Sequence, residues 1–336
     1  MSELAIGLVG CGRLARAGYL PALIAARGVR LAAVADPDPL RRETVVAVAG
    51  DAAAGCRVPA FRTLEGLLQG ARVDAVVLAT PVAAHLDDAQ LAANAGVATL
   101  VEKPPAPDAA GAAALAALGP APWVAFNRRF GAGQRAVRAA LAGREDSDHG
   151  SGGERAPGSA RPQRVDLMLE LRYRRASWGA HTVGDEALLD LGPHLVDLAR
   201  WLSGDEVAGV RAASLSHERA ELELDLERGR ATLRCAADRP HRELIEARGE
   251  DGHLLARHSE GGLVAGLCGR LARRGEPHPL VASLTAQLES FARAARGEPE
   301  PALATAADGH AVMAVLDAAR ACAAGGGRPV ELAVAA

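Results

Sequence analysis

Residues 4–15 have the sequence Leu4-Ala5-Ile6-Gly7-Leu8-Val9-Gly10-Cys11-Gly12-Arg13-Leu14-Ala15. The first six residues form a short apolar run, which is typical of a strand that is buried on both faces. The pattern GxGxxA follows at once, and the Ala- and Leu-rich residues 13–27 predict a helix. A strand, a glycine turn and a helix in this order predict the first unit of a doubly wound α/β fold.

The same alternation continues through the first 120 residues. Short apolar runs at residues 31–35, 75–79 and 99–101 predict buried parallel strands, and residues 40–49 and 85–95 predict helices. We therefore expect an N-terminal Rossmann-type domain over residues 1–120, built on a doubly wound parallel sheet. Pro-Ala-Pro at 120–122 marks the predicted end of this domain.

A different pattern follows residue 122. Alternating apolar side chains at 164–173, 221–226 and 231–235 predict strands with one buried face, and helices are predicted at 133–142, 280–296 and 306–323. These elements predict a C-terminal α+β domain over residues 121–336, with an open, mostly antiparallel sheet. Residues 143–162 contain no large apolar side chain, so we predict a mobile surface loop there.

The composition excludes several classes of protein. The net charge of −3 among 336 residues gives no support for a nucleic-acid or membrane-surface partner. The five cysteines are scattered without CxxC spacing, which argues against a disulfide framework or a metal site. No secretory segment is apparent, and no apolar run reaches the roughly 20 residues that span a membrane, so we expect a cytoplasmic protein.

The glycine motif has the features of a dinucleotide-binding loop. Gly10 permits the tight turn, Gly12 lets the backbone approach a pyrophosphate, and the small Ala15 allows close packing of helix and strand. The helix that follows would present its N-terminus to the anion. The position of the motif, directly between a predicted strand and a predicted helix, strengthens this interpretation.

Asp36 ends the second predicted strand, about 20 residues after the glycine motif. A carboxylate there accepts hydrogen bonds from a ribose and repels a 2′-phosphate, so the sequence favours NAD over NADP. The alternative role of Asp36 is turn formation, because Asp36-Pro37-Asp38-Pro39 is also a good loop sequence. Arg41 and Arg42 follow, and they weaken the preference unless they are solvated residues of the next helix.

Three polar residues lie within an apolar segment of the second domain. If the segment is helical, Asp190, His194 and Asp197 share one face, because their spacing is i, i+4, i+7. Such a stripe is either a solvent face or the wall of a cleft, and the leucines around it favour burial and therefore a site. Pro193 either kinks this helix or begins a new one.

Lys103 is the only lysine of the chain, and every other one of the 38 basic side chains is an arginine. A guanidinium stays protonated and cannot serve as a compact, tunable proton donor. Lys103 is therefore a candidate for a site that needs an ammonium group. The alternative is that one lysine survived by chance in an arginine-rich composition.

These motifs resemble the Gfo/Idh/MocA family of oxidoreductases over nearly the whole chain. The resemblance rests on Gly10–Ala15, Thr80-Pro81 with His85, Glu102-Lys103-Pro104, Asn127–Phe130, Asp190–Asp197 and Ala307–His310. One departure is the segment Val183-Gly184-Asp185-Glu186, which replaces a glycine-rich turn found in many members and bears on the shape of the pocket.

The resemblance implies a dehydrogenase that transfers a hydride between NAD and a secondary ring alcohol of a sugar, cyclitol or (amino)glycoside. Its catalytic residues would be His194 as general base, Lys103 stabilising the alkoxide and Asp190 supporting the histidine. Cofactor contacts are expected from Gly10, Gly12, Arg13, Leu14, Asp36, Thr80, His85, Glu102 and Lys103. Substrate contacts are expected from Lys103, Arg129, Tyr173, Trp178, His181, Asp190 and His194.

Several alternatives stay open at this point. Arg129, Tyr173, Trp178 and His181 could instead serve packing or lie on the surface. The chain could reduce a keto-sugar, cleave a glycoside with the help of NAD, or bind NAD as a regulator without catalysis. The resemblance also implies a homo-oligomer, a dimer or a tetramer, that associates through the C-terminal sheet.

Overall fold

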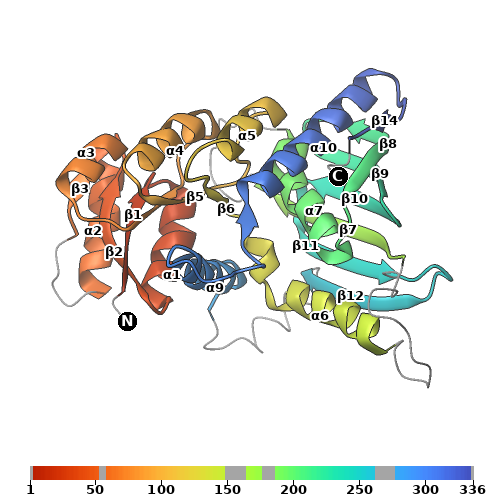
Figure 1. Ribbon diagram of the computed structural model, residues 1–336, viewed down its shortest axis with the longest axis horizontal. Helices are drawn as coiled ribbons and strands as arrows, with labels where there is room; N and C mark the ends of the chain where they lie inside the picture. The colour runs from red at the N-terminus through yellow and green to blue at the C-terminus, as the bar shows by residue number, and fades with distance from the viewer. Residues whose placement is uncertain (1–2, 53–57, 148–163, 176–185, 262–276, 334–336) are drawn as a thin grey trace. The chain divides into compact units, whose positions relative to one another are not determined.

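The computed structural model describes residues 3–52, 58–147, 164–175, 186–261 and 277–333, which belong to two compact units (Figure 1). One unit consists of Met1–Gly131 with Glu276–Met313, and the other of Ala132–Gly275 with Ala314–Ala336. A seven-stranded sheet lies in each unit. The units are therefore discontinuous in sequence, unlike the single boundary at residue 120 that the sequence predicts.

The first unit is built on a sheet with the order β13-β6-β5-β4-β1-β2-β3. Its strands are β1 (Leu4–Val9), β2 (Val29–Ala35), β3 (Ala60–Phe61), β4 (Ala75–Leu78), β5 (Ala98–Val101), β6 (Trp123–Val124) and β13 (Ala304–Thr305). All neighbouring strands are parallel except β13 and β6. The chain passes from β1 to β2 and β3 on one side and returns to β4 on the other. This doubly wound sheet confirms the predicted fold class.

Helices connect these strands. They are the π-helical turn η1 (Ala15–Tyr19), α1 (Leu20–Ala25), α2 (Pro39–Ala52), α3 (Leu64–Gly70), the 3₁₀ turn η2 (Val82–Ala84), α4 (His85–Asn94), α5 (Ala109–Ala116), the 3₁₀ turn η3 (Asn127–Phe130) and α9 (Pro279–Ala294). Several of them begin with side-chain N-caps that satisfy free amide groups, as α3 and α5 show. Thr63 accepts from the amide of Gly66 at 3.1 Å, and Asp108 accepts from that of Gly111 at 2.8 Å.

Helix α9 packs in the first unit although it lies far along the chain. Leu284, Leu288 and Phe291 are buried in the same apolar cluster as Ile6 of β1. The Phe291 ring also meets Trp123 of β6 edge to face, with ring centroids 5.7 Å apart. The sequence places residues 276–313 in the second domain. Burial of this apolar helix face explains why they belong to the first unit instead.

The second unit is built on a sheet with the order β12-β11-β7-β10-β9-β8-β14. Its strands are β7 (Asp166–Arg174), β8 (Val207–Leu215), β9 (Arg219–Leu226), β10 (Arg230–Ala236), β11 (Asp238–Arg248), β12 (Leu254–Gly261) and β14 (Val330–Glu331). Among the described pairs of neighbouring strands in this sheet, only β7 and β10 are parallel. Leu167, Leu169 and Leu171 alternate onto the buried face, as predicted. The prediction of a mostly antiparallel sheet is confirmed.

Three further helices are α6 (Ala132–Ser147), α7 (Ala187–Ser203) and α10 (Ala306–Ala324), the last divided between the units at Met313. Residues 143–147 continue α6, so the predicted loop at 143–162 is wrong at its start, where arginine and glutamate favour a helix. Residues 148–162 lie outside the described part. Among the described residues, no helix has both the length and the apolar character needed to cross a membrane.

The turn after β1 depends on a glycine. Gly10 has a φ angle of +89°, and a Cβ atom added there would lie 2.4 Å from the backbone oxygen of Ala79. We therefore expect Gly10→Ala to lower the free energy of unfolding by about 1–3 kcal/mol, because both the backbone angle and the contact become strained. Urea unfolding measures the change, with Gly12→Ala as the matched control, since a Cβ at Gly12 meets no atom within 4 Å. Equal stability of the two variants would contradict this interpretation.

Candidate functional site

The predicted cofactor residues of the first unit follow the carboxyl ends of neighbouring parallel strands. Gly10 follows β1, Asp36 follows β2, Thr80 lies two residues beyond β4, and Glu102 follows β5. Backbone hydrogen bonds join these ends: the amide of Gly10 donates to Ala35 at 2.7 Å, and that of Glu102 donates to Leu78 at 3.0 Å. The structure therefore brings the predicted residues together at the carboxyl ends of the strands, where doubly wound folds bind ligands.

The glycine loop fits a dinucleotide. Gly12 has open space where a Cβ would project, which is the room that a pyrophosphate needs beside the backbone. Ala15 is buried, so a larger side chain there would push the helix away from the strand. The open space at Gly12 and the burial of Ala15 support the roles predicted for these two residues, the approach of a pyrophosphate and the close packing of helix and strand.

Asp36 is buried, and its carboxylate is held by the backbone. One oxygen accepts from the amide of Cys11 at 2.7 Å and the other from the amide of Asp38 at 2.8 Å. A carboxylate has about four acceptor positions, so it can still accept from a ribose. Arg42 donates to the backbone oxygen of Asp36, and Arg41 pairs with Asp38 at 3.3 Å. Asp36 thus shapes the turn and keeps capacity for a ligand.

His85 connects two of these strand ends. Its Nε2 lies 2.9 Å from the backbone oxygen of Thr80, and its Nδ1 lies 3.1 Å from that of Pro104. Burial lowers the pKa of His85, and the hydrogen bonds to these carbonyl groups oppose that shift. Thr80 in turn donates its hydroxyl proton to Asp88 at 2.8 Å. His85 can therefore act on the site through the backbone, and its direct contact with the cofactor stays a prediction.

Lys103 lies on the turn after β5, next to a buried carboxyl group. One oxygen of Glu102 accepts from the backbone amide of Lys103 at 2.9 Å, and the other accepts from the hydroxyl of Tyr19 at 2.6 Å. Burial raises the pKa of Glu102, while the charge of Lys103 and the hydrogen bond from Tyr19 oppose the rise. Tyr19 was not predicted as a site residue. The available signal is that it is one of only two tyrosines in the chain.

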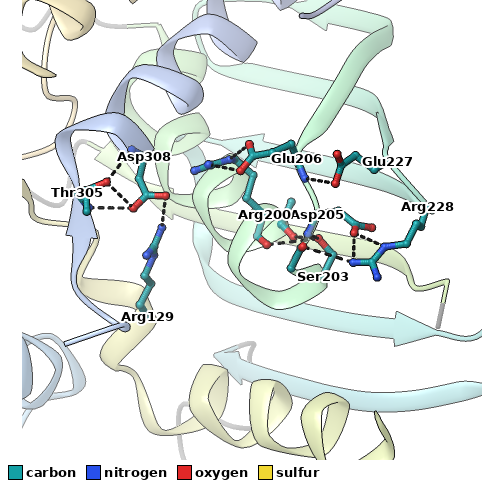
Figure 2. A network of polar contacts seen from close by, with 11 residues as sticks. Arg129, Arg200, Ser203, Asp205, Glu206, Glu227, Arg228, Thr305 and Asp308 are labelled. Atoms are coloured by element: carbon teal, nitrogen blue, oxygen red, sulfur yellow. Dashed lines mark hydrogen bonds and ion pairs between the residues drawn. The ribbon is translucent and has the colours of Figure 1, made fainter. Parts of the chain in front are cut away.

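Arg129 is buried beside an acidic residue of the same unit. Its guanidinium lies 3.5 Å from the carboxylate of Asp308, and the other Asp308 oxygen accepts from the amide and hydroxyl of Thr305 (Figure 2). This ion pair ties η3 to the start of α10. Contact of Arg129 with a substrate stays a prediction, and the packing role given as its alternative has support.

In the second unit, Asp190, His194 and Asp197 all lie on α7, which continues through Pro193 as one helix. The Asp190 side chain is 19% exposed, His194 is 8% exposed and Asp197 is 0% exposed. A solvent-facing stripe would be far more exposed. His194 and Asp197 are therefore buried and Asp190 is partly buried, as the leucines around the stripe predict.

Asp190 is held by two residues from the end of β7. The Tyr173 hydroxyl donates to its carboxylate, and the Arg175 guanidinium lies 3.6 Å away. Burial, and next the charge of Asp190, raises the pKa of Tyr173, so this hydroxyl keeps its proton. The structure thus joins two predicted site residues and adds Arg175, which directly follows the last residue of β7. Trp178 and His181 lie outside the described residues.

The end of α7 is anchored by capping and ion pairs. Gly204 takes a left-handed conformation with a φ angle of +69°, which ends the helix. Arg200 donates to both carboxylate oxygens of Glu206, at 2.6 and 2.7 Å, and Arg228 pairs with the buried Asp205 (Figure 2). These contacts fix the helix that carries His194.

Two family models match this chain. Residues 4–120 match the oxidoreductase family with an NAD-binding Rossmann fold, and residues 161–279 match the Gfo/Idh/MocA C-terminal domain. The chain belongs to the Gfo/Idh/MocA family. The first unit of this family member therefore contains an NAD-binding Rossmann domain, which agrees with the glycine loop described above.

Relatives and solved structures of the family differ in how much they share with this chain. An inositol 2-dehydrogenase of Rhizobium meliloti is 34% identical over 212 residues, which are 62% of this chain and 57% of that protein. GenD2 from gentamicin A biosynthesis, solved with NAD, has a TM-score of 0.77 and 22% identity, covering 99% of this chain and 97% of its own. Scyllo-inositol dehydrogenase from Lactobacillus casei, solved with NAD(H) and scyllo-inositol, has a TM-score of 0.74 and 18% identity, covering 98% and 99%. At these identities the two structures show a shared fold.

Proposed function

We propose that this family member is an NAD-dependent dehydrogenase that oxidises a secondary ring alcohol of a cyclitol or a related sugar. The relatives support the substrate class, since several of them are named inositol 2-dehydrogenases. The matched part of the chain spans 57% of the length of the Rhizobium meliloti relative, so activity and substrate are proposed from the residues and not transferred from its name.

The observation that carries the proposal is the position of Lys103. The only lysine of the chain lies on the turn after β5. The glycine loop and Asp36 also follow the carboxyl ends of strands of this sheet. An ammonium beside a cofactor loop suits a reaction in which negative charge develops on an alcohol oxygen. A surface role would not require a lysine, because arginine serves at every other basic position.

In the proposed reaction His194 accepts the hydroxyl proton of the alcohol, and Lys103 stabilises the negative charge that develops on that oxygen. Asp190 orients His194, and Tyr173 and Arg175 hold Asp190 in place. Bound NAD supplies the acceptor for the hydride that leaves the same carbon. The reverse reaction, reduction of a keto-sugar, uses the same groups with the proton moving from His194 to the oxygen.

The test is turnover by the purified protein with NAD and a panel of inositols, monosaccharides and aminoglycosides, followed by absorbance of the reduced cofactor. We expect turnover with at least one cyclitol or sugar. Release of an aglycone without net reduction of NAD would instead indicate glycoside cleavage. NAD binding without turnover in either direction would contradict the proposal and favour a regulator.

Asp36 provides a test of cofactor choice. We expect Asp36→Ala to weaken NAD binding about tenfold or more, because a hydrogen bond to a charged group is lost, and to reduce the preference for NAD over NADP. Asp36→Asn is the matched control for the turn, since its amide oxygen can still accept from the Cys11 amide. Calorimetric titration of each variant with both cofactors measures the preference. If Asp36→Ala leaves it unchanged, the assignment of Asp36 is wrong.

The exposed face of the second sheet is the surface that we propose for self-association. It carries ion pairs, among them Arg211 with Asp225 at 2.7 Å and Arg257 with Glu246 at 3.2 Å. Such a face is polar, so association there would rest on matched charges and weaken with added salt. Light scattering that finds a monomer at low salt would contradict this part of the proposal.

A further inference from the structure

An unusual helical turn places Tyr19 inside the first unit. Residues Ala15–Tyr19 form a π-helical turn, in which the amide of Leu20 donates to the carbonyl of Ala15, five residues earlier. Such turns insert one extra residue into a helix and are frequent at functional sites. The Tyr19 side chain that ends this turn is 0% exposed. A buried tyrosine hydroxyl needs a hydrogen-bond partner, and here the partner is Glu102.

Packing on the other side keeps this turn in place. Gly18 lies against α9, where an added Cβ would come within 2.8 Å of the Leu284 side chain. Leu284 itself is buried in the apolar core. The close approach of η1 and α9 therefore fixes the backbone on which Tyr19 stands, and the hydroxyl meets Glu102 from a rigid element.

A chain of contacts leads from Tyr19 to Lys103. The Tyr19 hydroxyl donates to one oxygen of Glu102 at 2.6 Å, and the other oxygen accepts from the Lys103 backbone amide at 2.9 Å. The Glu102 carboxyl group thus has both oxygens engaged. It joins the helix after the glycine loop to the turn that carries the amine. On the same turn, the backbone oxygens of Pro104 and Pro105 lie within hydrogen-bond distance of Nδ1 of His85.

The charge state of Glu102 depends on the same contacts. Burial raises its pKa, and the opposing groups are Lys103 on its own turn and Tyr19 from η1. His85 of α4 faces the carbonyl groups of Pro104 and Pro105, beyond the carboxyl group. Loss of the Tyr19 hydrogen bond removes a contact that favours the charged form, so the pKa of Glu102 would rise further.

We infer that Tyr19 is a positioning residue for Lys103: its hydroxyl fixes the Glu102 carboxylate, and Glu102 in turn fixes the backbone and the electrostatic surroundings of the amine. This inference rests on the proposed catalytic role of Lys103. Tyr19 lies outside the glycine, Glu-Lys-Pro and α7 motifs. Through Glu102 it connects the helix after the glycine loop to Lys103, and the sequence alone does not reveal this connection.

The single lysine makes a direct test possible. Protein grown with ¹³C-labelled lysine gives one lysine side-chain signal, and its shift with pH includes a step where Glu102 titrates, because the two charges interact. We expect Tyr19→Phe to move this step about one pH unit upward, since a hydrogen bond to the charged form is lost. Glu102→Gln removes the group that titrates, so the step should vanish and thereby be assigned.

Kinetics and a matched control complete the test. Tyr19→Phe is expected to lower kcat about tenfold to a hundredfold through a misplaced amine, while binding of NAD persists. Leu20→Val, a conservative change of the next buried residue, should leave both the step and kcat unchanged. If Tyr19→Phe does not fold, Glu102→Gln still tests the route, and wild-type kcat in that variant would overturn the inference.

The two readouts separate this inference from the proposed function. An upward move of the step in Tyr19→Phe supports the coupling even if no alcohol in the panel is oxidised, and in that case only the proposed function fails. Turnover in the wild type together with an unmoved step and an unchanged kcat in folded Tyr19→Phe would overturn the inference and leave the function standing.

Discussion

Lys103→Met is expected to lower kcat by about 10²- to 10³-fold, because a fixed cation at the developing alkoxide is lost. Binding of NAD should persist, since the glycine loop and Asp36 form the predicted contacts with that molecule. Methionine matches the length of the lysine stem, so the variant removes the charge with little change in packing. Stopped-flow measurement of cofactor reduction, with NAD affinity from calorimetry, separates loss of the chemical step from loss of binding.

Two further variants define what Lys103 contributes. Arg27→Met removes a cation from the same unit, but the Arg27 side chain is 95% exposed and pairs with Glu289 only at 3.9 Å, so activity should not change. Lys103→Arg keeps the charge and replaces the compact ammonium by a planar guanidinium, so we expect it to recover only part of the rate. A full rate in Lys103→Met would show that the survival of this single lysine is accidental.

The central strands of the first unit could be predicted from sequence because they are buried on both faces. The run at residues 4–9 is continuous and apolar, and β1 has the predicted bounds. The same holds within two residues for β2, β4 and β5. In such strands local composition and tertiary burial agree, so the sequence pattern alone locates them.

Strands β11 and β12 of the second sheet could not be located in the same way. β11 contains Arg239, Pro240, His241 and Arg242 in its first half, and its apolar residues are confined to the second half. β12 is an edge strand, and most of its side chains are partly or fully exposed. Neither segment alternates clearly between polar and apolar residues, because only pairing with β7 and its neighbours makes them strands.

Helix α9 was predicted as a helix but placed in the wrong unit. Its period of apolar residues shows that one face is buried, yet a period carries no information about the surface that covers this face. That surface is the core around Ile6 and Trp123, far away in sequence. The boundary between the units therefore depends on contacts that no local pattern encodes.

The residues of the candidate site also differ in whether local sequence or a distant contact determines their place. The places of motif residues such as Gly10, Asp36 and Lys103 could be predicted, because each follows a short apolar run that forms a strand. Tyr19 and Arg175 could not, because each matters through a partner elsewhere in the chain: Tyr19 meets Glu102, and Arg175 meets Asp190. Such paired residues are thus found only once the fold brings the two partners together.

His194→Gln is expected to lower kcat/KM by about 10²- to 10⁴-fold, which is the usual contribution of a positioned general base. Glutamine keeps a polar side chain in a site where His194 is 8% exposed, so the buried neighbours retain a hydrogen-bonding partner. A base must be free of its proton to act, so wild-type activity should fall on the acid side of the pH profile. That fall should be absent from the residual activity of the variant.

Rescue by added imidazole distinguishes a missing base from a damaged helix. If His194 accepts the hydroxyl proton, imidazole should restore part of the rate, in proportion to its unprotonated form. His217→Gln is the matched control, because His217 is an exposed histidine of the same unit and should tolerate the change. Equal losses in the two variants would assign the effect to the fold of the second unit. An unchanged pH profile in His194→Gln would remove His194 from the proposed mechanism and leave Lys103 to act with a different base.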